Sequence, residues 1–197
     1  MKQFKSICVF CGSSEGKDPD ILQAAYELGT ILAERNIELI YGAAKIGVMA
    51  RVAKGVQDHQ GKVTGVIPKF LTTKEVVHEG LDDLIVTTTM HERKTKMHEL
   101  SDAFITLPGG FGTLEELFEI ITWAQLGLHQ KPIGLLNING FYDPLVNMLS
   151  TMVSQKFLKQ ENMDLLLVAD TNKELFRKIE AYQPTVVPKW LNSLPKT

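Results

Sequence analysis

Leu107-Pro108-Gly109-Gly110-Phe111-Gly112-Thr113-Leu114-Glu115-Glu116 is a glycine-rich turn between an apolar run and a long amphipathic segment. The run at 103–107 predicts a short buried strand. Residues 113–126 predict a helix, because apolar side chains recur at helical spacing, at positions 114, 117, 118, 121 and 124. The glycines therefore connect the end of a strand to the start of a helix.

This glycine turn has the features of an anion-binding corner. Glycine tolerates positive φ and lets a ligand approach the backbone, while the free amides at a helix start favour negative charge. We therefore expect a phosphate here. Two structural alternatives remain open: Thr113 and Glu116 match a capping box, and Gly-Gly after a strand is ordinary turn chemistry.

Short apolar runs alternate with helical segments along the rest of the chain. Strands are predicted at 6–10, 38–41, 62–67, 84–88, 103–107, 132–136 and 165–169, and helices at 19–35, 46–60, 91–101, 113–126, 144–160 and 172–181. This pattern predicts a doubly wound, Rossmann-like α/β fold, a parallel sheet flanked by helices on both faces. The loops at 11–14, 42–45, 68–80, 89–93 and 108–112 then gather on one sheet edge.

Length and composition indicate one globular domain, residues 1–197, with an irregular tail from about residue 183. The chain has 197 residues, 44% of them hydrophobic, and a net charge of −2, which suit a single full core. Lys and Arg are spread along the chain, so neither nucleic acid nor an anionic membrane is an expected partner. No run reaches membrane-spanning length and no signal-peptide core is present, so we expect a cytoplasmic protein.

Several motifs that would indicate other chemistry are absent or incomplete. Cys8 and Cys11 have C-x-x-C spacing, but no second Cys or His pair follows at zinc spacing. We therefore expect buried, reduced thiols and no metal. The first strand-to-helix turn lacks the G-x-G-x-x-G motif of dinucleotide-binding proteins. Residues 12–17 are one residue short of the Walker loop of NTPases, and the zinc-protease motif H-E-x-x-H does not occur.

The stretch Met90-His91-Glu92-Arg93-Lys94 opens the helix predicted at 91–101. Cations in a first turn oppose the helix macrodipole by about 0.3–1 kcal/mol each, which suggests that Arg93 and Lys94 have a use there. The alternative is that both are simply solvated. Because this turn lies on the same sheet edge as the glycines, Arg93 could hold a phosphate through two parallel hydrogen bonds.

Glu115 and Glu116 would repel a phosphate that they touched, so we expect them to face another part of the ligand. If the glycine turn and Arg93 hold a 5′-phosphate, a nearby carboxylate meets the sugar. There it can bind hydroxyls, orient a water and stabilise positive charge at the anomeric carbon. These residues therefore suggest hydrolysis of an N-glycosidic bond.

The chain resembles the Lonely Guy (LOG) family, cytokinin riboside 5′-monophosphate phosphoribohydrolases that have also been labelled lysine decarboxylases. Residues 108–116 match the family motif P-G-G-x-G-T-x-x-E, and residues 90–94 match M-H-x-R-K. The resemblance extends from residues 9–14 to residues 134–137. It implies a Rossmann-like homodimer that releases an adenine-type base and ribose 5-phosphate from AMP or its N6-prenylated form, with no metal or cofactor.

By this resemblance, Arg93 and Glu116 are the catalytic pair. Arg93 would hold the substrate and offset negative charge, and Glu116 would stabilise the oxocarbenium-like state or position water. The implied substrate contacts are Glu75, Lys94, Gly110, Phe111, Gly112, Thr113, Leu114, Glu115 and Thr122.

Thr122 lies about 14 Å from Thr113 along a straight helix, so it would serve a site shared with the neighbouring subunit. Without the resemblance, Thr122 would be an ordinary helix threonine and Glu75 a solvated loop charge. Ile120 and Trp123 extend the apolar surface of the helix beyond one core-facing stripe, which favours a dimer.

One position departs from the family pattern. Many members have glycines after the Tyr41-Gly42 pair, whereas this chain has Ala43 and Ala44. Alanine resists positive φ and adds methyl groups, so the departure bears on the shape of this loop and on the ligand that it admits.

Two rival functions remain beside hydrolysis. The first is a non-catalytic nucleotide-binding protein on the same scaffold, which would bind AMP without turnover. The second is a decarboxylase, but that chemistry uses pyridoxal phosphate on a lysine, and no lysine here lies in a recognisable cofactor context.

Overall fold

The structure of the protein is a computed structural model that describes residues 3–72, 77, 78 and 80–184. Its strands are β1 (Ser6–Phe10), β2 (Glu38–Tyr41), β3 (Val63–Pro68), β4 (Asp83–Thr87), β5 (Ala103–Thr106), β6 (Ile133–Leu136) and β7 (Leu166–Ala169). Neighbouring strands all pair in parallel, in the order β4-β3-β2-β1-β5-β6-β7. The predicted parallel sheet is confirmed, and each strand lies within one residue of its predicted bounds.

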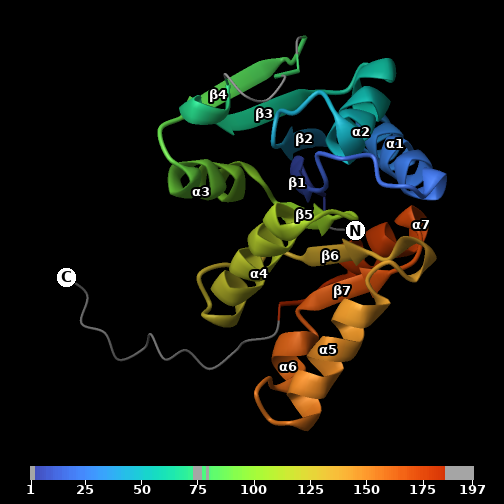
Figure 1. The fold of residues 1–197 in the computed structure, drawn as a ribbon, viewed down its shortest axis with the longest axis vertical. Coiled ribbons are helices and arrows are strands. Elements are labelled where there is room, and N and C mark those ends of the chain that lie inside the picture. The colour runs from blue at the N-terminus through green and yellow to red at the C-terminus, as the bar shows by residue number, and fades with distance from the viewer. Residues whose placement is uncertain (1–2, 73–76, 79, 185–197) are drawn as a thin grey trace.

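Helices cover both faces of this sheet (Figure 1). On one face lie α1 (Pro19–Glu34), α2 (Gly47–Asp58) and α7 (Asn172–Ala181), and on the other lie α3 (Met90–Leu100), α4 (Phe111–Gln125) and α5 (Asp143–Ser154). The shorter elements are α6 (Gln160–Met163) after α5, and the 3-10 turns η1 (Lys69–Leu71) and η2 (Ile138–Gly140) after β3 and β6. The doubly wound α/β fold predicted from the alternating pattern is therefore confirmed.

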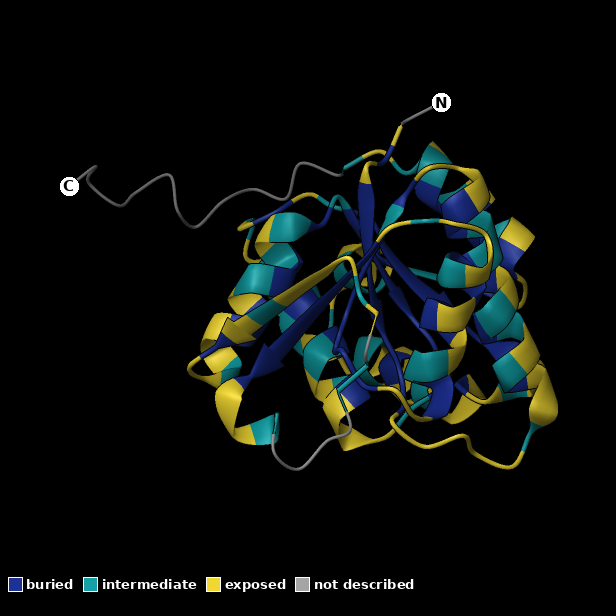
Figure 2. Cartoon of the chain, turned by 90° about the horizontal axis from the view of Figure 1, so that it is seen from above, coloured by how far each residue is buried: buried dark blue, intermediate teal, exposed yellow. Residues whose placement is uncertain are grey.

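The core consists of two apolar clusters, one on each face of the sheet. Ile7 and Val9 of β1 point into one cluster, and Cys8 and Phe10 point into the other. Central strands are therefore buried on both faces (Figure 2). β4 differs because it is an edge strand with an exposed surface.

β1 lies between β2 and β5, where the strand order reverses direction. In open α/β sheets, ligands bind outside the carboxyl ends of the strands at this reversal. The loops after β1 and β5 touch there, since the amide of Gly12 donates a 3.1 Å hydrogen bond to the carbonyl oxygen of Pro108. The carbonyl of Gly12 accepts a 3.2 Å bond from the amide of Met49 in α2. The backbone thus joins these loops into one corner.

The helix boundaries differ more from the prediction than the strand boundaries do. The helix expected at 144–160 ends at Ser154, because Lys156 takes a φ of 63° and the chain turns before α6 begins. The helix expected from residue 113 starts at Phe111. Cys8 and Cys11 are buried and unpaired, as expected. No helix in the described ranges is long and apolar enough to cross a membrane, and most of the tail expected from about residue 183 lies outside those ranges.

Candidate active site

Arg93 and Glu116, which come from separate helices, meet in the structure. Arg93 is the fourth residue of α3 and Glu116 is the sixth residue of α4. Nη1 of Arg93 donates a 3.0 Å hydrogen bond to Oε1 of Glu116, and Nε donates a 2.9 Å bond to the carbonyl oxygen of Val66 in β3. The exposed fractions of the two side chains are 10% and 11%. They form a buried ion pair anchored to the sheet.

The surroundings of Glu116 favour its protonated form more than water does. Burial raises the pKa of Glu116, the charge of Arg93 works against this rise, and Glu115 adds to it. Burial also raises the pKa of the Cys8 and Cys11 thiols, with a further contribution from Glu116. Neither thiol is therefore a ready nucleophile.

Lys94 is also buried, with 8% of its side chain exposed, and it is already paired. Its Nζ donates to Oε1 of Glu115 at 2.5 Å and to Oε1 of Glu119 at 3.0 Å. Burial by itself lowers the pKa of Lys94, but hydrogen bonds to these two carboxylates outweigh burial and raise that pKa. Lys94 therefore holds a fixed positive charge between α3 and α4.

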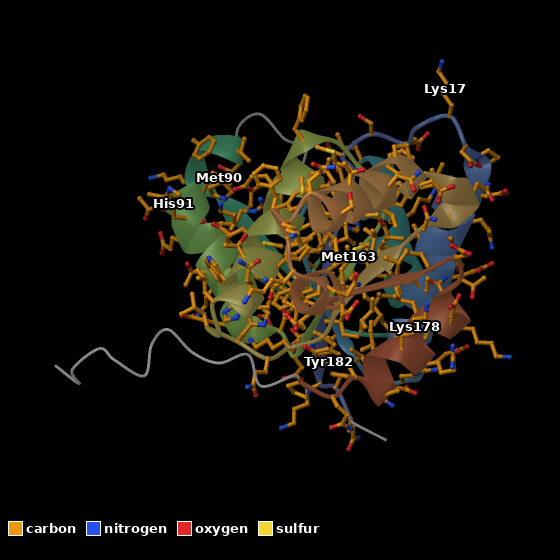
Figure 3. All side chains as sticks on the ribbon, turned by 90° about the horizontal axis from the view of Figure 1, so that it is seen from below. Lys17, Met90, His91, Met163, Lys178 and Tyr182 are labelled. Atoms are coloured by element: carbon orange, nitrogen blue, oxygen red, sulfur yellow. The ribbon has the colours of Figure 1, made fainter. Side chains whose placement is uncertain are left out.

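The M-H-x-R-K stretch divides between the surface and the site. Arg93 and Lys94 are buried, so the alternative in which both are simply solvated is wrong. Met90 and His91 lie at the start of α3 near the outside of the molecule, and His91 is exposed (Figure 3). The two cations are therefore the part of this stretch that can act in the site.

The glycine turn leaves an open corner at the start of α4. Gly110 is the N-cap residue, no described side chain caps this end, and the first turn carries no acidic side chain. The amides of Phe111, Gly112 and Thr113 therefore have no helical carbonyl partner. A methyl group on Gly110 or Gly112 would meet nothing within 4 Å, so both glycines border open space. Free amides at a helix start of this kind can receive an anion.

The capping box predicted for Thr113 and Glu116 is wrong, because α4 begins two residues earlier than expected. Thr113 is buried beside Gly109, where a Cβ atom would overlap Oγ1 of Thr113 and would lie 2.8 Å from the amide nitrogen of Gly12. Glycine at position 109 is therefore required for the close packing of the two loops.

A capping interaction of this kind occurs at the start of α3 instead. Oγ1 of Thr89 accepts a 3.1 Å hydrogen bond from the amide of Glu92, whose carboxylate accepts a 2.7 Å bond from the amide of Thr88. Because α3 begins one residue earlier than predicted, Arg93 is its fourth residue and Lys94 its fifth. The macrodipole falls off within the first turn, so it acts more weakly on these two cations than the prediction assumed, and their buried ion pairs are the stronger sign of a function.

The loop after β2 closes over Arg93. A Cβ atom on Gly42 would overlap Nη2 of Arg93, so glycine leaves room for the guanidinium. Ala43 takes a φ of 64° although alanine resists positive φ. Its carbonyl accepts a 3.0 Å bond from the amide of His78, and Gly65 leaves space for its methyl group. The loop therefore makes a left-handed turn in spite of the alanine.

Not all of the predicted substrate contacts gather at this pair. Thr122 is exposed on α4, and its Oγ1 donates a 2.7 Å bond to the carbonyl of Phe118. Leu114 is half-buried and packs against the core. Glu75 lies outside the described residues.

The two residues that suggested a dimer, Ile120 and Trp123, pack inside the subunit. Ile120 is buried, and Trp123 makes an edge-to-face contact with His98 at a ring-centroid distance of 5.3 Å. The argument from these two residues is therefore wrong. Large apolar side chains are exposed on and just after α4 at other positions: Phe111, Phe118, Leu126 and Leu128.

Two residues of the site were missed in the sequence. Glu119 lies four residues after Glu115, and this spacing places both on one helix face and was the available signal. Gly42 follows a predicted strand directly, but no sequence pattern shows that Arg93 fills the space beside it.

The site combines a helix start with free amides and a buried ion pair. The open amides can bind phosphate oxygens, while Glu116 can hold a proton, orient a water or stabilise nearby positive charge. No cluster of His, Cys, Asp and Glu suited to a metal ion occurs within the part of the chain that is described. The arrangement suits bond cleavage beside a phosphorylated sugar.

Comparison with known proteins gives consistent matches. The family model described as "Possible lysine decarboxylase" matches residues 49–179. The cytokinin riboside 5′-monophosphate phosphoribohydrolase LOG of Oryza sativa subsp. japonica is 48% identical over 182 residues, which cover 92% of this chain and 75% of that protein. The phosphoribohydrolase LOG3 of Arabidopsis thaliana is 47% identical over 92% of this chain and 85% of its own length.

Solved structures give a more distant match. The molybdenum cofactor binding protein from Rippkaea orientalis has a TM-score of 0.67 at 25% identity, covering 89% of this chain and 95% of that one. The Moco carrier protein from Chlamydomonas reinhardtii has a TM-score of 0.66 at 21% identity over 89% of this chain and 94% of that one, which shows the fold alone. From the family match and the plant relatives, this chain belongs to the LOG family of cytokinin riboside 5′-monophosphate phosphoribohydrolases, which the lysine decarboxylase description covers.

Proposed function

We propose that the protein hydrolyses the N-glycosidic bond of a cytokinin riboside 5′-monophosphate, an N6-prenylated form of AMP, and releases the free base and ribose 5-phosphate. The plant relatives that match over most of the chain are named for this activity. The observation that carries the proposal is the buried Arg93–Glu116 pair, in which Glu116 lies one helix turn after the open amides at the start of α4.

The phosphate of the substrate binds at the start of α4. Amides of residues 111–113 point out of the helix end, and the positive end of the helix dipole favours a dianion there. Nη2 of Arg93 is engaged neither by Glu116 nor by Val66, so it can donate to a substrate oxygen. The ribose then lies over the second turn of α4, next to the carboxylate of Glu116.

Hydrolysis breaks the bond between the anomeric carbon and the base nitrogen. Water supplies a hydroxyl to the carbon and a proton to the base, so no other reactant is consumed. As the bond lengthens, positive charge develops on the sugar. Glu116 stabilises this charge or positions the water, while Arg93 holds the carboxylate and offsets negative charge.

Apolar side chains around the site favour the prenylated nucleotide over AMP. The loops or turns after β2, β3, β5 and β6 each expose a large apolar residue, and these are Ile46, Phe70, Phe111 and Phe141. Exposed apolar groups that gather near a site indicate a binding surface. A prenyl group on the base can be buried against this rim, whereas the base of AMP offers no aliphatic group.

The experiment is a side-by-side rate comparison. Purified protein is incubated with AMP and with N6-prenylated AMP, and the free base is measured by chromatography. We expect base from both, with a higher kcat/KM for the prenylated nucleotide. Failure of folded protein to release base from either nucleotide contradicts the enzymatic proposal. Saturable binding without turnover would establish the rival function of a non-catalytic nucleotide-binding protein.

We further propose that the protein is a cytoplasmic homodimer that binds neither nucleic acid nor membranes. The exposed Phe118, Leu126 and Leu128 support a subunit contact along α4. Thr122 lies among them, so it would reach the site of the partner subunit. Light scattering tests the dimer, and a monomeric mass at micromolar concentration contradicts it. The unpaired cysteines support the cytoplasmic location. The net charge of −2 supports the statement that neither nucleic acid nor a membrane is bound.

A further inference from the structure

Charged side chains make up much of the buried contact of α3. Its buried residues are Arg93, Lys94 and Met97. Two of these three are cations, and each donates to a carboxylate of α4. The relative position of α3 and α4 therefore depends on these ion pairs as well as on the ring contact between His98 and Trp123.

The two sets of ion pairs are neighbours because the two cations are consecutive residues of α3, and Glu115 and Glu116 are consecutive residues of α4. Arg93 reaches Glu116, and Lys94 reaches Glu115 and Glu119. Because Arg93 and Lys94 are consecutive residues of the same helix, a shift of Lys94 along α4 moves Arg93 by a similar amount. The Lys94 contacts therefore act together with the bond from Arg93 to Val66 on the distance between the guanidinium of Arg93 and the carboxylate of Glu116.

Glu119 is the more protected partner of Lys94. The exposed fraction of its side chain is 23%, compared with 53% for Glu115. Glu115 is also nearer the open corner of α4, where the ribose hydroxyls of the proposed substrate would attract it. If Glu115 turns to the sugar, Glu119 still pairs with Lys94, which is 8% exposed and would otherwise be a buried unpaired charge.

We propose that Glu119 is a positioning residue for the reaction, which holds Lys94 and thereby fixes α3 against α4 so that Arg93 and Glu116 keep their productive separation. This inference rests on the proposed function for its kinetic consequence. Glu119 itself touches neither the substrate nor the reacting atoms. Its removal therefore lowers kcat more than it raises KM.

The kinetic test compares Glu119→Ala with Glu119→Gln, whose side-chain oxygen can still accept from Lys94. For Glu119→Ala we expect kcat to fall by about 10-fold or more, since small misplacements of catalytic groups are costly, and KM to change less than about twofold. Glu119→Gln should recover most of the loss. The matched control is Glu99→Ala, which removes an exposed partner of Lys96 on α3 and should leave kcat unchanged.

A double-mutant cycle shows whether Glu119 acts through Lys94. In the Lys94→Met background, Glu119→Ala should cause little further loss of kcat, because the interaction is already absent. Independent losses that multiply would contradict the positioning role. So would a folded Glu119→Ala variant with wild-type kcat, or one in which only KM rises.

A measurement without substrate separates this inference from the proposed function. Native-state hydrogen exchange should show faster exchange for amides of residues 93–97 in Glu119→Ala than in the wild type, with α1 and α2 unchanged. Equal exchange in α3 overturns the positioning role. Wild-type protein that releases no base contradicts the proposed function, whereas altered exchange in that case still supports the role of Glu119 in fixing α3.

Discussion

Gly42→Ala is expected to impair catalysis although it replaces neither of the two proposed catalytic residues. Its Cβ atom would overlap Nη2 of Arg93, since carbon and nitrogen atoms need about 3.5 Å between them. The guanidinium must then move by roughly 1 Å, which breaks or lengthens its 3.0 Å bond to Glu116. A displacement of this size in a catalytic constellation costs about 10²-fold in rate. We therefore expect kcat/KM to fall by about two orders of magnitude.

The assay is release of free base from N6-prenylated AMP by the variant and the wild type, with folding checked by thermal unfolding. Arg93→Lys provides the matched background, because lysine lacks the Nη2 atom that the new methyl group would meet. Gly42→Ala should therefore cost much less in Arg93→Lys protein than in the wild type. A folded Gly42→Ala protein with activity within twofold of the wild type would refute the reasoning.

Three further predictions concern acidity and packing. Because burial raises the pKa of Glu116 and its ionised form is needed, kcat/KM should fall as pH decreases, with half-loss above the ordinary value of about 4.3; a profile flat from pH 7 to 4 would contradict this. Gly109→Ala should lower the free energy of unfolding by about 1–3 kcal/mol in denaturant titrations, because its methyl group overlaps Oγ1 of Thr113. Burial lowers the pKa of His98 to about 4, so the unfolded chain takes up its proton at higher pH than the folded one. Stability should therefore decline as pH falls from about 6.5 to 4, and His98→Phe should flatten that decline in melting temperatures.

The fold was largely predictable because its signals are local. Each strand is a short apolar run, and burial on both faces of a parallel sheet produces such runs. The errors occur where backbone geometry overrides composition. Lys156 breaks a continuous helical pattern by taking a φ of 63°, and Gly112 belongs to a helix although glycine usually marks a turn.

The site was predictable only as far as sequence motifs reach. The motifs identified Arg93 and Glu116 as a pair, but they could not show that both are buried or that Lys94 is bound by two carboxylates. The contact between Gly42 and Arg93 joins loops and helices that are distant in sequence, so only the three-dimensional structure reveals it. The roles of these residues in the reaction stay predictions.

The bond between Gly12 and Pro108 uses main-chain atoms alone, and the proposed phosphate site beside it is likewise built from amides and glycines. Outside the glycines themselves, such as Gly109, side-chain exchange hardly alters such a scaffold. The part of the proposed site that would meet the sugar and the base is made of side chains, which mutation can change one at a time. During evolution, related enzymes could thus come to accept a different nucleobase or a longer alkyl substituent on the base, while the main-chain contacts to the ribose 5-phosphate moiety are retained.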